Sequence, residues 1–306
     1  MHSILFLLSL WSPDVERDLI RKVGEKCFTT IECTATTCGK FKERAVFSEH
    51  SKCPHCGGKL RVKVAQSRNV PVSTFTEKYA REVMQAAIDK SYKGSLFVVR
   101  GARCPELSLT GGSAADLAIV RRKLQSAFKA EDIVVVMEVK MSLVWNWKPG
   151  EDKPSADFFQ HNGRPSLSRT DSLLKAIGKG AIFRSTEKSR RIPYLVIGNC
   201  PPPQGYYAKL DGAVRSGLVQ KFISLTPKPV LSGSPVRNPK QTRGGGFLRI
   251  DSMDELSDLL KQIIDGQGVY IGRMVDRKEL GEKIKALDTD RPSEAVADRF
   301  IEALLK

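Results

Sequence analysis

The stretch Ile133-Val134-Val135-Val136-Met137-Glu138-Val139-Lys140 decides the fold that we expect for this chain. Its β-branched run predicts a buried strand, and the apolar run that follows Asp116, at 117–120, predicts another. Side chains alternate along a strand, so Glu138 and Lys140 point to the same face. A carboxylate in such a strand needs a partner, because burying its charge alone is costly. If the two strands are neighbours, Asp116 approaches Glu138 closely enough for both to bind one divalent cation.

A pair of carboxylates with a lysine is suited to the hydrolysis of phosphodiesters. Mg²⁺ prefers oxygen ligands and takes its remaining ligands from water and substrate phosphate. The ion and Lys140 would lower the pKa of a bound water and stabilise the charge that develops on phosphorus. The alternative is that Glu138 and Lys140 only form a salt bridge at a strand end. Two other acid-x-Lys triplets, at 151–153 and 276–278, lie in a polar loop and at a helix start, where no buried strand fixes them.

The rest of the chain predicts helices and strands on both sides of these two runs. Ser12 is expected to cap a helix that Gly24 ends, and Thr76 to cap a helix that reaches Lys90. Further strands are expected at 95–100, 117–120, 132–140, 192–198, 220–225 and 247–250, and helices at about 170–183, 253–265 (after a capping box at Ser252), 276–287 and 293–305. This order predicts an α/β fold, a mixed central sheet flanked by helices.

The pair Ala115-Asp116 and the triplet Glu138-x-Lys140 resemble the motif of the PD-(D/E)xK nuclease superfamily, over a core from about 75 to 198. Ala115 stands where members commonly have proline. The resemblance implies that Asp116 and Glu138 bind Mg²⁺ and that Lys140 takes part in catalysis. It also implies an acid on the first helix, for which Glu77 is the candidate, unless Glu77 is only a favourable first-turn acid. Within the superfamily the chain is most similar to type II restriction endonucleases, which usually act as homodimers on short duplex sites.

Four cysteines predict a zinc site near the N-terminus. Cys33 and Cys38 form a C-x4-C pair, and Cys53 and Cys56 form a C-x2-C pair after a gap of 14 residues. Four thiolates around tetrahedral zinc make a structural site, and the pattern resembles a zinc ribbon. Glycine follows the second cysteine of each pair, where a tight turn is needed. Cys27, His50 and His55 are spares: Cys27 could replace Cys33 as a ligand, and His55 should point outward, with either a solvated or a phosphate-contacting role. Cys104 and Cys200 are expected to be buried small apolar groups.

We expect four parts along the chain. They are an N-terminal helical segment at 1–26, the zinc-ribbon-like module at 27–66, the nuclease core at 67–230, and a basic loop, an edge strand and C-terminal helices at 231–306. The Pro/Gly/Ser-rich stretch at 227–246 contains Lys and Arg but no acid, which predicts a mobile basic loop. Two roles stay open for the module: a stabilising unit without DNA contact, or one whose basic residues touch phosphates (Lys40, Lys42, Arg44 and Lys52).

The charge of the chain favours a polyanionic partner such as double-stranded DNA. Fifty Lys+Arg against 34 Asp+Glu give a net charge of +16, although a basic protein with another role is the alternative. Residues 160–230 contain twelve Lys/Arg and three Asp/Glu, a concentration that phosphate binding requires. Trp145 and Asn146 are candidates for base contacts, unless the tryptophans belong to the core. The other candidate DNA contacts are Gln160, His161, Asn162, Arg164, Arg169, Lys175 and Lys179.

The apolar run at 4–11 is too short to span a bilayer, and neither a preceding Lys or Arg nor a small-x-small cleavage site marks a signal peptide. We expect a buried N-terminal segment or a start-codon artefact, and a cytoplasmic protein without membrane contact. The leading function is a Mg²⁺-dependent type II restriction endonuclease with structural zinc. The alternatives are a structure-specific repair or junction nuclease with the same site, and a non-catalytic zinc-ribbon nucleic-acid-binding protein.

Overall fold

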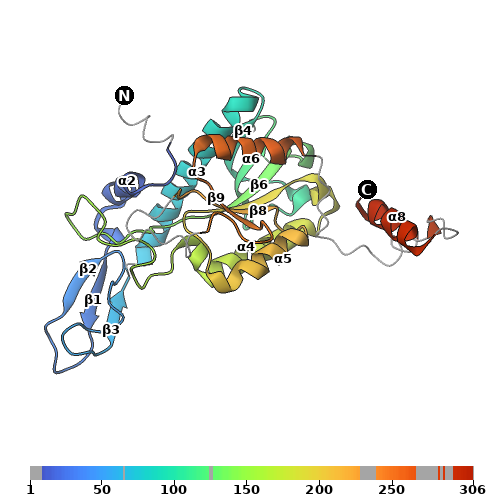
Figure 1. The fold of residues 1–306 in the computed structure, drawn as a ribbon. Helices are drawn as coiled ribbons and strands as arrows, with labels where there is room; N and C mark the ends of the chain where they lie inside the picture. Colours follow the sequence, from blue (N-terminus) through green and yellow to red (C-terminus); the bar gives the residue numbers. More distant parts are fainter. Residues whose placement is uncertain are drawn as a thin grey trace.

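A six-stranded mixed sheet forms the centre of the molecule, in the order β4-β5-β6-β7-β8-β9 (Figure 1). The computed structural model describes residues 9–64, 66–123, 127–227, 239–266, 282, 285–286 and 292–305. β4, β5 and β6 are antiparallel, and β7, β8 and β9 continue the sheet parallel to β6. The strands are β4 Phe97–Ala102, β5 Ala115–Val120, β6 Ile133–Lys140, β7 Tyr194–Gly198, β8 Lys221–Ser224 and β9 Phe247–Arg249. The predicted mixed sheet, with its short edge strand β9, is confirmed.

Helices cover both faces of this sheet, because alternate residues of each strand are apolar on both sides. Leu117, Met137 and Ile197 pack in one core cluster with α3 (Asn69–Tyr92) and α6 (Met253–Asp265). Ala118, Val136 and Val196 pack in a second cluster, with α4 (Thr170–Arg184) and α5 (Tyr207–Arg215). Glu138 follows Val136 by two residues and therefore faces α4.

The helix α3 begins earlier than the sequence predicts. It starts at Asn69, so Thr76 is an interior residue whose hydroxyl donates to the Ser73 carbonyl (3.1 Å) and not an N-cap. Pro71 is compatible with this start because the first turn of a helix needs no proline N–H. The predicted apolar stripe, from Ala80 to Ile88, is buried.

The N-terminal segment joins the sheet domain. In α2 (Pro13–Val23), the Ser12 hydroxyl accepts from the Val15 N–H (3.4 Å) and Gly24 ends the helix with φ 68°, as predicted. The Trp11 N–H donates to the carbonyl of Leu225 (3.0 Å), directly after β8. Residues 4–8 of the apolar run lie outside the described residues.

The C-terminal region is described in part. The Ser252 hydroxyl accepts from the Glu255 N–H, as a capping box requires. The Glu255 side chain accepts from the N–H of Asp251 and not from that of Ser252, so the second bond differs from the predicted capping box. Lys240 pairs with Asp251 and Glu255, whereas residues 228–238 of the predicted mobile loop lie outside the described residues. The helix expected at 276–287 also lies outside them, apart from 282 and 285–286, and α8 spans Ser293–Leu305.

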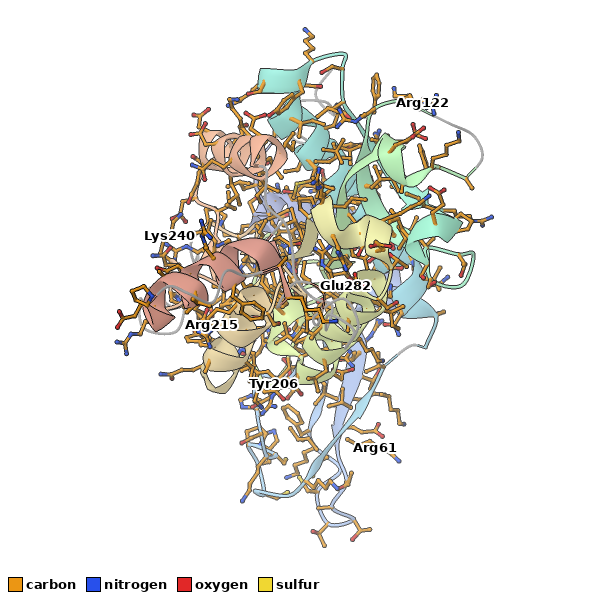
Figure 2. All side chains as sticks on the ribbon, turned by 90° about the vertical axis from the view of Figure 1, so that its right-hand side faces the viewer. Arg61, Arg122, Tyr206, Arg215, Lys240 and Glu282 are labelled. Carbon is orange, nitrogen blue, oxygen red and sulfur yellow. The ribbon has the colours of Figure 1, made fainter. Side chains whose placement is uncertain are left out.

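A small antiparallel sheet carries the cysteines and extends away from the main sheet (Figure 1). It consists of β1 (Thr29–Cys33), β2 (Lys42–Ala45) and β3 (Leu60–Lys63) in the order β2-β1-β3. Arg61 on β3 lies at the opposite end of the molecule from Arg122 (Figure 2). Short 3₁₀ turns link the elements, at Gly24–Cys27, Gln66–Arg68, Pro105–Leu107, Ala130–Asp132, Ser166–Ser168, Glu187–Arg191 and Gln204–Tyr206.

Candidate active site and metal centres

The register of the sheet brings Asp116 and Glu138 together. β5 pairs antiparallel with β6 so that Leu117 lies opposite Met137, and one further step of this register places Asp116 opposite Glu138. The Asp116 Oδ2 accepts a hydrogen bond from the backbone N–H of Val139 (2.8 Å), which anchors it to β6. The two carboxylates that the sequence singles out are therefore neighbours on the α4 face.

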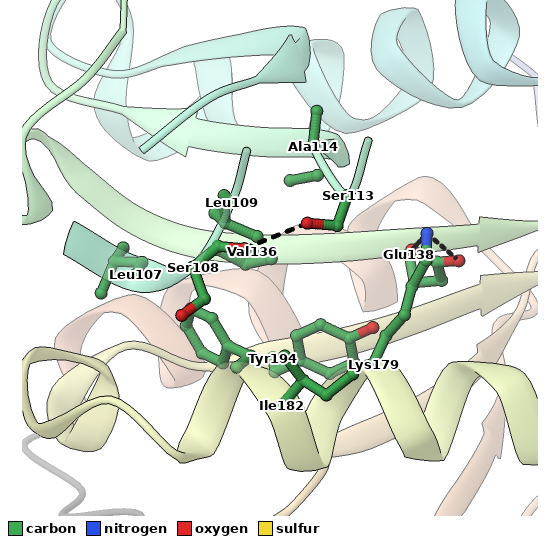
Figure 3. Close-up of a pocket in the computed structure, with 12 residues that line it drawn as sticks. Leu107, Ser108, Leu109, Ser113, Ala114, Val136, Glu138, Lys179, Ile182 and Tyr194 are labelled. Carbon is green, nitrogen blue, oxygen red and sulfur yellow. Dashed lines mark hydrogen bonds and ion pairs between the residues drawn. The ribbon is translucent and has the colours of Figure 1, made fainter. Parts of the chain in front are cut away.

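Two lysines neutralise this pair. Lys179 on α4 places its Nζ 2.8 Å from a Glu138 carboxylate oxygen (Figure 3). The same Nζ lies 4.0 Å from Asp116 Oδ1. Lys140 forms a second ion pair with Glu138, as the alternation along β6 allows. Lys179 is a predicted DNA contact, and its distance to Glu138 also makes it a member of the acidic site. The sequence feature that could have indicated this role is a lysine on a helix that packs against the strand of Glu138.

The electrostatics of the site favour cation binding. Glu138 is 2% exposed, so its charge is stabilised mainly by the two ammonium groups. Burial, and then the charge of Glu138, raise the pKa of Asp116 to about 6. Burial acts to lower the pKa of Lys179, but the hydrogen bond and attraction to Glu138 outweigh it and raise that pKa. The charge of Glu138, which helps to raise the pKa of Asp116, also attracts a divalent ion.

The donor set fits Mg²⁺. Mg²⁺ is commonly held by one or two carboxylates and otherwise by water and phosphate oxygens, and Asp116 and Glu138 supply two. Lys179 bridges both carboxylates, which is the position that a shared cation needs. A pocket of about 40 Å³ adjoins Glu138 and Lys179, with Tyr194 and Ser113 in its wall (Figure 3). That volume accommodates a few waters and no nucleotide.

Glu77 does not join these two acids. Its carboxylate lies 3.6 Å from the guanidinium of Arg100 on β4, and α3 packs on the sheet face opposite to the one that Glu138 faces. Within the described ranges, the four cysteines are the one group of three or more metal-ligand side chains that lie together. The charge of Glu77 helps to raise the pKa of Lys179, which pairs with Glu138, so its place beside the metal ligands stays a prediction.

The segment after β6 is part of the core and not a base-reading element. Trp145 and Asn146 are fully buried, because the chain passes beneath α2 at this point. The Asn146 side chain accepts from the Phe47 N–H (2.9 Å) and donates to Glu49 (2.8 Å). The expectation that Trp145 and Asn146 contact DNA is therefore wrong in this structure, and the alternative core role holds.

Glu16, which is not among the residues predicted from the sequence, holds this segment in place. Its buried carboxylate accepts four hydrogen bonds: from the backbone N–H groups of Val144 and Trp145 (both 2.9 Å) and from the indoles of Trp11 and Trp147 (both 3.1 Å). Burial raises the pKa of Glu16 to about 8, while these donors lower it. The sequence feature that could have indicated this role is an acidic residue on the apolar side of an amphipathic helix.

The loop candidates divide into structural and exposed residues. His161 is buried, stacks on Phe47 with ring centroids 4.1 Å apart and bonds the Val144 carbonyl, and burial lowers its pKa. The Gln160 side chain accepts from the Asp157 N–H, and Asn162 donates to the Ser48 carbonyl. The exposed cationic candidates are Arg164, Arg169 and Lys175.

The four predicted zinc ligands form a cluster. The Sγ atoms of Cys33, Cys38, Cys53 and Cys56 all lie within 4.8 Å of one another, a set that fits tetrahedral zinc. Desolvation acts to raise the pKa of Cys53, but the N–H groups of His55 and Cys56 and the neighbouring thiols lower it to about 7, which favours the thiolate. Gly57 has φ +70°, as the turn after Cys56 requires, whereas Gly39 has no positive φ.

The spare candidates lie outside this cluster. Cys27 is buried beneath the module and does not belong to the group, and His50 and His55 both contact the Phe41 ring. Cys104 and Cys200 are fully buried, as predicted. Among the basic residues of the knuckles, Arg44 pairs with Glu25.

The chain has no detected relatives. No family model matches it, and neither the curated proteins nor the solved structures contain a match. Among the described residues, no helix has the length and apolar character needed to cross a membrane.

Proposed function

We propose that this protein is a metal-dependent nuclease that hydrolyses phosphodiester bonds in DNA. The observation that carries the proposal is the placement of Asp116 and Glu138 on adjacent antiparallel strands, with the ammonium groups of Lys140 and Lys179 on Glu138. The helix, three-strand meander, helix and parallel strand around this site are the order that the PD-(D/E)xK resemblance implies.

The residues of the site have distinct roles in such a reaction. Asp116 and Glu138 would hold Mg²⁺, which supplies an acidified water and positive charge beside the phosphate. The attacking water would lose a proton as its oxygen forms a bond to phosphorus, the bond from phosphorus to the leaving oxygen would break, and the leaving oxygen would take up a proton. Lys140 and Lys179, whose ammonium groups pair with Glu138 in the free protein, stabilise negative charge on the phosphate oxygens.

The resemblance implies the substrate of a type II restriction endonuclease: a short specific sequence in double-stranded DNA, cut by a homodimer. The excess of Lys and Arg supports a polyanionic substrate. A repair or junction nuclease would use the same residues on a particular DNA structure. The proposed Zn²⁺ at Cys33, Cys38, Cys53 and Cys56 has a structural role, because all four ligand positions come from the protein.

Incubation with plasmid and Mg²⁺ tests the proposal. Discrete fragments support a restriction endonuclease, and nicking confined to branched or frayed DNA supports a structure-specific enzyme. The matched variant Glu138→Gln should bind DNA and fold as the wild type but not cut. DNA binding without cleavage by the wild-type protein would instead identify a zinc-ribbon binding protein.

A further inference from the structure

A cleft separates the zinc module from the core and reaches Lys140 at the end of β6. Two adjoining hollows, of about 540 and 260 Å³, share the lining residues Phe47, Arg68, Asn69, Arg164 and Arg169. We name them together the module–core cleft. Its outer part is lined by strand residues of the module and its inner part by the segment that follows β6.

The inner end of the cleft reaches the proposed catalytic residues. Val139 and Lys140 line it, and the N–H of Val139 is the group that binds Asp116. Lys140 in turn pairs with Glu138. The inner hollow therefore reaches Lys140, the ion-pair partner of Glu138, whereas neither Asp116 nor Glu138 lines it.

Positive charge dominates the walls of the cleft. Arg68, Arg164, Arg169 and Lys140 line it against one acid, Asp171. Arg164 is exposed, and within the part of the chain that the structure describes its guanidinium has no ion-pair partner. Arg169 pairs with Asp171 at 2.9 Å, but both side chains are exposed, so a phosphate can replace this weak partner. Arg68 is largely fixed by the carbonyls of Cys27 and Val46.

The opposite wall is apolar and exposed. Val62 and Val64 are 47% and 53% exposed, and they are two of the five large apolar side chains that the described part of the chain leaves exposed. Both line the outer cleft with Phe47. Exposed apolar surface beside arginines matches a ligand that presents phosphates on one side and sugars and bases on the other.

We infer that the module–core cleft binds an unpaired DNA strand that continues from the scissile phosphate. A duplex presents phosphates outward and keeps its base faces stacked, so the wall of Val62 and Val64 would have no counterpart there. An unpaired strand offers phosphates to Arg164 and Arg169 and base faces to the valines. The inference rests on the proposed nuclease function, assigns the substrate an unpaired segment beside the cut, and gives the module a DNA contact through β3 instead of through its cysteine knuckles.

Fluorescence anisotropy without added Mg²⁺ tests the cleft on one labelled DNA in three forms: single-stranded, blunt duplex, and duplex with a single-stranded overhang. Arg164→Ala/Arg169→Ala and Val62→Ser/Val64→Ser should each weaken binding of the unpaired and overhang forms by roughly tenfold or more, with little change for the blunt duplex. The arginine variant should also lower the salt slope for single-stranded DNA by roughly 1.4, for two phosphate contacts.

Matched controls come from the same chain. Val70 on α3 is 72% exposed but does not line the cleft, so Val70→Ser should bind as the wild type. Lys93→Ala removes a charge just beyond the C-terminal end of α3, about 36 Å along the helix from Asn69 in the cleft. Retained zinc and an unchanged melting temperature show that each variant is folded.

Two results would overturn the inference: cleft variants that bind all three DNAs as the controls do, or an equal loss for the blunt duplex. Failure of the nuclease proposal has a different signature. If wild-type protein with Mg²⁺ cuts none of the three DNAs while the cleft variants still lose binding of the unpaired strand, the cleft stands and the catalytic assignment fails.

Discussion

Glu16 and Glu138 are both buried carboxylates, yet their surroundings differ in one decisive respect. Glu16 accepts four hydrogen bonds from two backbone N–H groups and two indoles, and all four donors are fixed by the fold. Glu138 faces the ammonium groups of two flexible lysines and, across the strand pair, a second carboxylate. Fixed neutral donors make a structural carboxylate, whereas replaceable cations leave a site that can exchange its partners.

The largest expected effect is on DNA cleavage, which should depend on Glu138 and distinguishes it from Glu16. Glu138→Gln should lower Mg²⁺-dependent cleavage by at least about 10²-fold, because it removes a metal ligand and the partner of both lysines. Its urea unfolding midpoint should stay near that of the wild type. A Glu138→Gln protein that cuts DNA at the wild-type rate would remove Glu138 from the active site.

Stability should respond in the opposite way. Glu16→Ala leaves four buried N–H donors without their acceptor and should lower the free energy of unfolding by about 4 kcal/mol or more, measured by urea titration. The control is Asp18→Ala on the same helix, a partly exposed position that pairs with the exposed Arg21 at 3.9 Å, where the change should stay within about 0.5 kcal/mol. If Glu16→Ala costs no more than its control, the hydrogen bonds to Glu16 do not stabilise the fold.

The pH dependence of metal binding sharpens the contrast. The pKa of Asp116 is raised to about 6, so below that pH a proton competes with the ion. Mn²⁺ affinity, measured by calorimetry, should fall as the pH drops through 6 and level off above it. Without metal, the folded state holds this proton more tightly than the unfolded state, so stability from this group falls as the pH rises from 3.8 toward 6. A flat Mn²⁺ profile between pH 5 and 7, values on the order of one unit either side of that pKa, would contradict the assignment of Asp116 as a ligand.

The smallest effect concerns the cation that bridges the two acids. Lys179→Met removes the ammonium group that competes with a divalent ion, so Mn²⁺ affinity should rise roughly two- to tenfold, as expected for a partly exposed ion pair. Lys175→Met, one helical turn earlier and exposed, is the matched control and should leave affinity unchanged. Weaker Mn²⁺ binding by Lys179→Met would show that Lys179 supports the ion instead of replacing it.

Much of the site could be predicted because it depends on local pattern. The period-2 alternation of a valine-rich strand placed Glu138 and Lys140 on one face, and the spacing of Cys33, Cys38, Cys53 and Cys56 indicated one metal cluster. The role of Glu77 stays a prediction, because helical period gives a direction relative to the helix and does not give the sheet face on which the helix packs. The prediction that Thr76 is an N-cap was wrong because residues that favour the N-cap also occur within helices.

The sequence by itself determined the strands, the facing of Glu138 and Lys140, and the four thiol ligands, because alternation and short spacings are fixed by backbone geometry. Only the tertiary structure decided the partners that come from distant segments. It placed Lys179 against Glu138 across 41 residues and Glu16 against the segment after β6 across more than 120. It also formed the cleft between module and core. Contacts of this kind depend on how helices pack on a sheet, which no local period encodes.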